Sequence, residues 1–326
     1  MLTIYVLAYN RPEYLGQCLD SISAQTHSGL KVVVLDNASQ TNLRAVTKGF
    51  PDLNIHYMRH PKNLGSTGNI KYAWHQPKDT EFFMMFHDDD LLHPRFLEIG
   101  LGALGKNDDV AWLASEFQPF KSDPPAYRSI ESAEPLLLDE AQLAYGLMKH
   151  EFKLAFSSVI YRSADVDRID LDGFYSSHSI IFDRPMLFKL ASDRRCAILR
   201  SPLLLYRLHP MQDSKTGPVS EDNLLALCSS YRSALSPIWT NEIQKEFYAW
   251  SGHELVAGYR QVAHDKKSSL ANYLKKAREQ GVYQDRLLAN YLFGQVKNWV
   301  KTLFRAGHML FSSPRQFLEA IRFRLR

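Results

Sequence analysis

The chain has 326 residues, of which 45% are hydrophobic and 23% charged, and its formal net charge is +4. This length and composition predict a globular protein with a full core, and leave room for one large domain and an appendage. The small net charge, with basic residues concentrated near the C-terminus, argues against a nucleic-acid-binding protein.

The cysteines and the N-terminus indicate a reducing compartment. Cys18, Cys196 and Cys228 are odd in number and widely separated, and they follow neither zinc-ligand nor redox spacing. The first residues contain no basic segment followed by a long apolar one, and no window reaches the ~20 apolar residues of a membrane span. We therefore expect a cytoplasmic protein without a standard secretion signal.

The first hundred residues alternate between strand and helix patterns. Leu2–Leu7 and Lys31–Leu35 are short apolar runs, typical of strands covered on both faces. Between them, Pro12–Gln25 places apolar residues at helical spacing, with proline in the tolerated first turn. The pattern continues with a strand, a helix and a strand at Asn54–Met58, Thr67–Trp74 and Phe82–Phe86. This order predicts an α/β fold with a mainly parallel sheet flanked by helices.

Polar loops follow four of these predicted strands. Ligands of open α/β sheets bind beyond the carboxyl ends of the strands, so these loops predict a site. Asp36 can accept from a ring N–H of a nucleotide base on which Tyr9 stacks, while Arg59 and Lys62 can approach a diphosphate. Each loop alone is ordinary turn chemistry, but four at one sheet edge favour binding. The loops are Ala8–Arg11, Asp36–Ser39, Arg59–Asn69 and Asp88–Asp90.

The adjacent carboxylates of Asp88, Asp89 and Asp90 end an apolar run and predict a cation site. Three like charges within a few ångströms raise one another's pKa, and a cation among them relieves the repulsion. Mg²⁺ and Mn²⁺ favour one or two carboxylates together with substrate phosphates, which implies a phosphorylated substrate. The alternative is a solvated turn in which one aspartate caps a helix that begins near Pro94.

The motifs, in order, resemble those of glycosyltransferase family 2, which has the GT-A fold. The resemblance covers residues 1 to about 216, and its members include bacterial O-antigen and capsule glycosyltransferases. It rests on the runs YVLAYNR, VVVLDNAS, HPKNLGSTGNI and FFMMFHDDDLLHP, and on two later ones, LDGFYSSHSIIFDRPMLFKLA (Leu171–Ala191) and LYRLHPMQDS (Leu205–Ser214).

The resemblance implies a role for individual residues. Tyr9 and Asp36 would recognise the base, Asp88 would hold the ribose or a water, and Asp89 and Asp90 would anchor Mn²⁺ or Mg²⁺. His209 would complete the metal shell, and Arg207 would add positive charge near the diphosphate. The nucleotide-sugar contacts are expected from Ala8, Tyr9, Asn10, Arg11, Asp36, Arg59, Asn63, Gly65, Asn69, Asp88, Asp89 and Arg207.

Two positions depart from the family pattern. His87 stands where the common Asp-x-Asp-Asp form has its leading aspartate, which leaves the ligand assignment within the triplet open. Asp183 aligns with the catalytic carboxylate, although the family's Glu-Asp-x-Asp run is reduced here to Phe-Asp-Arg-Pro. Its implied role is general base of an inverting transfer. The alternative is an N-cap of the helix Pro185–Ala191.

The function implied is transfer of a sugar from a UDP, dTDP or GDP sugar to a hydroxyl of a lipid-linked surface glycan. Two other classes stay open, a nucleotidyltransferase that uses the same carboxylates and an inactive nucleotide-sugar-binding module. A dehydrogenase is excluded because no Gly-x-Gly-x-x-Gly follows the first strand.

The resemblance also implies a division of the chain. Residues 1–218 would form the GT-A catalytic domain, with a nucleotide-sugar half at 1–115 and an acceptor half at 116–218. Gln118–Pro135 and Tyr175–Ile181 would line the acceptor side.

From Glu221 to Lys276 the pattern is helical, so 219–326 is expected to be an α-helical appendage. Its last segment, 297–326, carries seven Lys or Arg against one Glu, interleaved with aromatic and aliphatic residues. That pattern is typical of basic amphipathic helices that lie on an anionic membrane, here the inner face of the cytoplasmic membrane. A helical hairpin docked on the protein is the equal alternative.

Overall fold

The computed structural model describes residues 1–130, 133–210, 212, 219–261 and 269–285. These residues form a nine-stranded mixed sheet in the order β3-β2-β1-β4-β8-β6-β9-β5, with β7 paired to β9. The strands are β1 (Leu2–Ala8), β2 (Leu30–Asp36), β3 (Ile55–Arg59), β4 (Phe82–His87), β5 (Leu91–Leu92), β6 (Val110–Phe120), β7 (Leu136–Leu138), β8 (Leu154–Arg162) and β9 (Arg195–Arg207). The helices are α1 (Pro12–Ser23), α2 (Leu43–Thr47), α3 (Gly65–His75), α4 (Phe96–Gly105), α5 (Glu140–Met148), α6 (Leu171–His178), α7 (Asp183–Ala191), α9 (Glu221–Ala234), α10 (Asn241–Gln261) and α11 (Leu270–Glu279).

The first four long strands form the parallel part of the sheet. β1 pairs in parallel with β2 and β4, and β2 with β3. Beyond β4 the directions mix, because β8 is antiparallel to both β4 and β6 while β9 runs parallel to β6. The predicted strands and helices of the first hundred residues lie within about two residues of the observed ones. The expected mixed α/β sheet flanked by helices is therefore confirmed.

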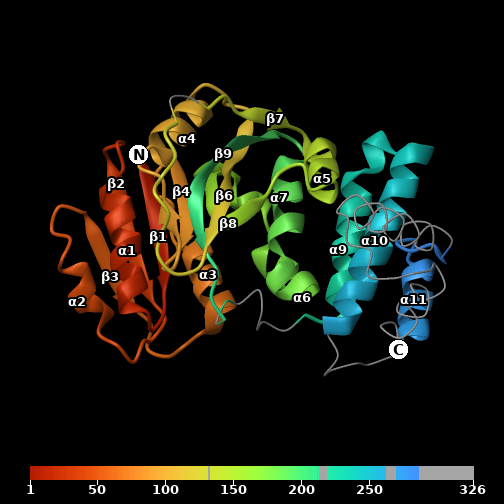
Figure 1. Cartoon of the computed structure of the whole chain (residues 1–326), viewed down its shortest axis with the longest axis horizontal. Helices are drawn as coiled ribbons and strands as arrows, with labels where there is room; N and C mark the ends of the chain where they lie inside the picture. Colours follow the sequence, from red (N-terminus) through yellow and green to blue (C-terminus); the bar gives the residue numbers. More distant parts are fainter. Residues whose placement is uncertain (131–132, 211, 213–218, 262–268, 286–326) are drawn as a thin grey trace, which may run out of the picture.

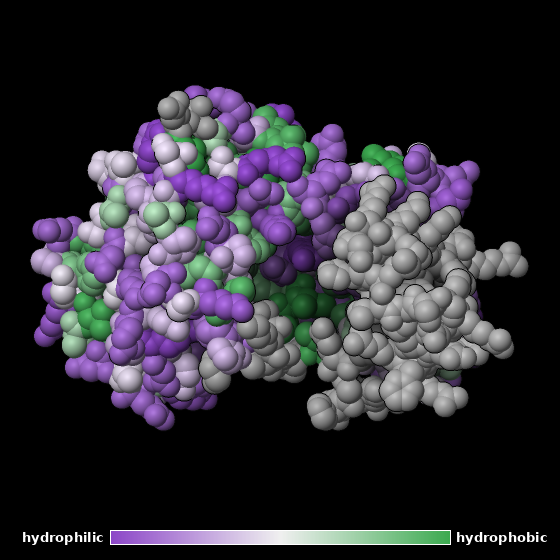
Figure 2. Space-filling model, in the orientation of Figure 1, coloured by the Kyte–Doolittle hydropathy of each residue, from purple (hydrophilic) through white to green (hydrophobic). Residues whose placement is uncertain are grey.

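Helices cover both faces of the sheet. Along β1, Ile4 and Val6 point into one apolar cluster with α1 and α4, whereas Tyr5 and Leu7 point into the other, with α3, α5, α6 and α7. This period of two is the reason the strand reads as a continuous apolar run. Both layers are visible in Figure 1. On the surface, Figure 2 shows mostly hydrophilic residues, with hydrophobic ones at the floor of a central hollow.

The C-terminal helices pack at the end of the molecule opposite β3 (Figure 1). Their core is continuous with that of the sheet domain, because the Phe188 ring of α7 lies 4.8 Å from the Tyr231 ring of α9, which lies 4.3 Å from Trp250 of α10. The boundary placed at residue 218 stays a prediction. The helical character expected of Glu221–Lys276 is present in α9, α10 and α11.

Two further expectations concern membranes. Among the described residues, the structure contains no helix that is both long and apolar enough to cross a bilayer. The basic segment 297–326 lies outside the described residues.

Candidate functional site

The parallel strand register brings the polar loops to one edge of the sheet. Ala8 at the end of β1 is paired with Asp36 at the end of β2, and Asp36 with Arg59 at the end of β3. On the other side of β1, Leu7 is paired with His87. Residues separated by up to 80 positions in sequence therefore start their loops side by side, as the sequence predicts.

Asp36 is buried at this edge with both carboxylate oxygens engaged. Oδ1 accepts from the Ser39 N–H at 2.8 Å, and Oδ2 accepts from Arg59 Nη1 at 2.9 Å and from the Tyr57 hydroxyl. Burial opposes ionisation, but these donors outweigh it and lower the pKa of Asp36. Tyr57 was not predicted, although its position two residues before Arg59 on one strand face was a usable signal. A pocket of about 290 Å³ beside them is lined by Asn42, Arg44, Tyr57 and Arg59.

The first loop carries four predicted contacts, of which Tyr9 and Asn10 lie at its centre. Tyr9 is 37% exposed, and its backbone N–H donates to Asp88 Oδ2 at 3.0 Å. Asn10 has a φ of 58°, and its N–H donates to Ser39 Oγ at 2.9 Å, which ties the first loop to the second. The Tyr9 ring is thus open to a planar ligand while its backbone is fixed.

The predicted residues of the third loop lie in two different environments, one exposed and one buried. Asn63 and Gly65 are exposed in a turn where Asn63 Oδ1 accepts from the Gly65 N–H at 2.7 Å. Asn69 is buried in α3, where its amide donates to the Leu35 carbonyl at 3.2 Å and its Oδ1 lies 2.9 Å from His60 Nε2. The side chain of Asn69 therefore supports the end of β2 from inside.

The three aspartates are all buried, with exposures of 0%, 7% and 1% along the chain. Arg11 joins two of them, since it donates to Asp88 Oδ1 and, at 2.9 Å, to Asp89 Oδ2. Burial raises the pKa of Asp88 to about 7 despite the nearby Arg11. Burial also opposes ionisation of Asp89, but His209 and Arg11 outweigh it and lower the pKa of Asp89 to about 2. The capping alternative is wrong, because α4 begins at Phe96 after Arg95, and no side chain caps it.

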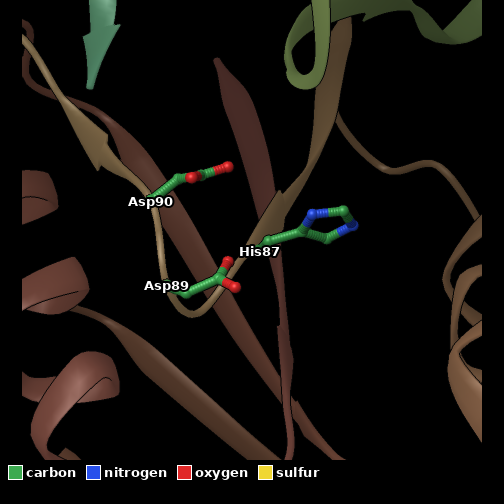
Figure 3. Close-up of side chains that lie close together, drawn as sticks. All are labelled: His87, Asp89 and Asp90. Carbon is green, nitrogen blue, oxygen red and sulfur yellow. The ribbon is translucent and has the colours of Figure 1, made fainter. Parts of the chain in front are cut away.

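The third aspartate has an unused acceptor. Asp90 Oδ1 accepts from the Arg207 N–H at 3.0 Å, whereas Oδ2 is buried with no hydrogen-bond partner among the described residues. Burial, with Asp89 close by, raises the pKa of Asp90 well above its usual value. One donor atom each from His87, Asp89 and Asp90 lies within 4.8 Å of the others (Figure 3). Two carboxylates, one with an unsatisfied buried oxygen, and an imidazole suit a divalent cation.

His209 and Arg207 meet the triplet from β9 and the loop that follows it. His209 Nε2 lies 2.7 Å from Asp89 Oδ2. Arg207 is 2% exposed, and its Nε donates to the Asp89 carbonyl at 2.9 Å. The structure therefore places Arg207 under the triplet as a support, and its direct contact with a diphosphate stays a prediction.

Asp183 is half-buried at the first position of α7. Its side chain does not cap the helix, so the N-cap alternative is wrong; Phe182 precedes the helix and no side-chain cap bond forms. The described residues offer the Asp183 carboxylate no hydrogen-bond partner. It opens on a pocket of about 140 Å³ that is also lined by Phe156, whose ring stacks on His87 with centroids 5.6 Å apart. No local sequence pattern indicates Phe156, because its contact with His87 joins β8 to β4, which are neighbours only in the folded sheet.

The predicted acceptor segments lie on different elements. Ser122 accepts from Arg207 Nη1 at 3.2 Å, and the Tyr127 ring lies 5.3 Å from that of His93, so the first segment packs near β5. In the second, Tyr175 stacks on Phe182 with ring centroids 4.0 Å apart, directly before Asp183. Their roles toward an acceptor stay predictions.

The chain belongs to glycosyl transferase family 2, whose sequence model matches residues 3–166, about half of the chain. An uncharacterized glycosyltransferase of Rickettsia typhi is 22% identical over 242 residues, which cover 72% of this chain and 73% of that protein. One of Haemophilus influenzae is 26% identical over 121 residues, 35% of this chain and 36% of that protein.

Solved structures agree in fold. The crystal structure of S. aureus TarS residues 1–349 covers 95% of this chain and 93% of its own, with 15% identity and a TM-score of 0.59. Its complex with UDP-GlcNAc has the same coverage, with 14% identity and a TM-score of 0.58. The protein is therefore a glycosyltransferase with the GT-A fold, which confirms the resemblance found in the sequence and disfavours a nucleotidyltransferase.

Proposed function

We propose that this glycosyltransferase transfers a sugar, with inversion, from a nucleoside diphosphate sugar of the UDP, dTDP or GDP type to a hydroxyl of a lipid-linked glycan. The observation that carries the proposal is the meeting of Tyr9, Asp36 and Arg59 with the buried triplet at one sheet edge. The solved complexes of TarS with UDP and UDP-GlcNAc support a nucleotide donor and put UDP first among those to test.

The donor would lie across the loops in the order in which the strands present them. The exposed Tyr9 ring offers a stacking surface beside Asp36 and Arg59, which suits a base with a ring N–H. Arg11, with Asn10 and the Asn63–Gly65 turn, offers donors toward a diphosphate. Ala8 at the end of β1 is fully buried, so its contact with the donor would come through the backbone.

A divalent cation, Mn²⁺ or Mg²⁺, fits at Asp89 and Asp90, with an imidazole nitrogen for which the family resemblance names His209. When bound, such a cation would supply positive charge to the diphosphate leaving group. Asp88, whose two oxygens accept from Arg11 and from the Tyr9 N–H, would hold the ribose or a water, as the family resemblance implies.

The transfer itself needs a base on the face opposite the leaving group. The acceptor oxygen would form a bond to the anomeric carbon, while the bond from that carbon to the diphosphate oxygen breaks and its electron pair leaves with the nucleoside diphosphate. The acceptor hydroxyl proton would pass to the Asp183 carboxylate, which has no hydrogen-bond partner in the described residues and opens on a pocket.

With such an acceptor, the enzyme would act at the cytoplasmic face of the membrane, in O-antigen or capsule synthesis. A lipid-linked glycan must be met at the bilayer surface, and the basic segment 297–326 would attach the protein to anionic lipid. Removal of 297–326 should then abolish binding to anionic vesicles, and unchanged binding would rule this segment out as the anchor.

Calorimetric titration of UDP, GDP, dTDP and CDP, each with and without Mn²⁺, tests the donor site. We expect one nucleotide to bind in a metal-dependent way, Asp90→Ala to abolish that binding, and Asp109→Ala, which removes an exposed carboxylate paired with Arg195, to leave it unchanged. Failure of every nucleotide to bind would refute the proposal.

A further inference from the structure

We propose that His87, and not His209, is the nitrogen ligand of the divalent cation, and that this ligand gives the enzyme a preference for Mn²⁺ over Mg²⁺. This inference rests on the proposed function, because it concerns the cation that the donor site would hold. It concerns a residue by which this chain departs from its family, since an aspartate is common at this position.

The donor atoms of His87, Asp89 and Asp90 lie close to the spacing of one coordination shell. They lie within 4.8 Å of one another without any ion present to draw them together. Around an ion about 2.1 Å from each ligand, adjacent ligands are separated by about 3.0 Å and opposite ones by about 4.2 Å. Side-chain adjustments would therefore bring the three donor atoms to a single ion. Figure 3 shows the Asp89 and Asp90 carboxylates on one side of His87, whose ring extends away from them and would turn toward that ion.

Asp90 supplies an independent indication that a ligand belongs here. Its Oδ2 is buried and accepts no hydrogen bond from the described residues, while Oδ1 is held by the Arg207 N–H at 3.0 Å. A buried acceptor without a partner is costly, and a cation would satisfy it. The carboxylate is thus fixed on one side and open on the other.

The His87 ring is held in place from behind. It stacks on the Phe156 ring with an interplanar angle of 25°, and the His87 backbone N–H faces Ser157 Oγ at 3.4 Å. Phe156 also lines the pocket of Asp183, so the same ring contacts the His87 imidazole and the pocket of the predicted general base. A ring with few accessible orientations loses little entropy when it binds a metal.

His209 is placed differently, as an outer partner. Its Nε2 lies 2.7 Å from Asp89 Oδ2. The same Nε2 also lies 3.1 Å from Arg11 Nη1, so two side chains already engage this nitrogen, and among the described residues it is not one of the donor atoms that lie within 4.8 Å of one another. Hydrogen bonds of this kind orient a metal-binding carboxylate from outside the shell. His209 is therefore a positioning residue for Asp89.

The identity of the ligand set predicts metal preference. Imidazole nitrogen binds Mn²⁺ more readily than Mg²⁺, which favours an all-oxygen shell. His87→Asp would restore the family's carboxylate at this position. We expect the ratio of its Mn²⁺ affinity to its Mg²⁺ affinity to fall by about tenfold or more. Loss of a residue that only orients a metal ligand already costs about tenfold in affinity, and loss of a ligand itself should cost at least as much.

Pulsed electron paramagnetic resonance of Mn²⁺ bound to the full chain, with and without UDP, tests the assignment directly. A coordinated imidazole nitrogen modulates the Mn²⁺ echo, and this signal reads coordination without measuring activity. We expect the nitrogen modulation in the wild type and in His209→Gln, and its loss in His87→Asp. Circular dichroism and the thermal midpoint of each variant show that the fold is retained.

The other outcomes overturn the inference. Nitrogen modulation that survives in His87→Asp and disappears in His209→Gln would make His209 the ligand. Bound Mn²⁺ without nitrogen modulation in the wild type would exclude both imidazoles, yet leave the proposed function intact if UDP binding still depends on the metal. Nitrogen modulation from His87 without binding of any nucleotide would support the metal site and refute the donor. Absence of Mn²⁺ binding would refute both.

Discussion

Replacement of Arg207, which supports the aspartate triplet, by methionine should lower the free energy of unfolding. The guanidinium is buried and donates from three nitrogens, to the Asp89 carbonyl at 2.9 Å, to the Ser122 carbonyl at 3.2 Å and to the side-chain oxygen of Gln17. These contacts join β9, the triplet loop, the segment after β6 and α1. The substitution keeps much of the apolar volume and removes every donor.

The cost follows from those contacts. Hydrogen bonds from a charged group contribute about 1.5 to 3 kcal/mol each, and their buried acceptors would lose a partner. The guanidinium also lies 4.2 Å from the Tyr14 ring centroid and 4.5 Å from that of Phe120, contacts of about 0.5 to 2 kcal/mol. Because one side chain makes all of them, the values are not additive. We expect a loss of about 3 to 5 kcal/mol in the free energy of unfolding, as for other broken buried charge contacts.

Urea unfolding followed by circular dichroism measures this loss. Arg200→Met is the matched control, because Arg200 lies exposed on the same strand and, within the part of the chain that the structure describes, donates only to the Glu151 carbonyl, at 2.8 Å. That control should lose about 1 kcal/mol or less. If the two variants lose equal stability, Arg207 does not hold the triplet loop in the way described.

Three further predictions concern the base, pH and packing. Asp183→Asn should slow transfer by about 10²- to 10⁴-fold while calorimetry finds nucleotide binding unchanged; a smaller loss excludes it as the base. The pKa of Asp88 is raised to about 7, so the folded state binds the Asp88 proton more tightly than the unfolded state does. The metal-free protein should therefore lose stability as the pH rises from about 4 to 7. Asp88→Asn should flatten that slope in thermal unfolding, and an unchanged slope contradicts the assignment. Gly146→Ala places Cβ 2.5 Å from the Phe152 ring and should lower the free energy of unfolding by about 1 to 3 kcal/mol. The control, Gly102→Ala, places Cβ where nothing lies within 4 Å and should raise that free energy by about 0.5 to 1 kcal/mol. Urea unfolding measures both, and equal effects would show that the Phe152 ring moves aside.

The sequence by itself determined the local elements and the edge at which the site lies. Apolar runs such as Leu2–Leu7 specify strands covered on both faces, and helical periodicity specifies α1, since both signals are carried by neighbouring residues. Parallel strands then present their following loops together, so Asp36, Arg59 and the triplet could be assigned to one site before any contact was known.

The tertiary structure decided how those residues are used. His209 reaches Asp89 across 120 positions, and the stack of His87 on Phe156 depends on β8 lying beside β4, an arrangement that no local pattern encodes. Burial likewise distinguishes Arg207, a support, from the partly exposed Arg11. Periodicity reports which face a residue takes on its own element, whereas partners, burial and pKa depend on the other elements that pack against that face.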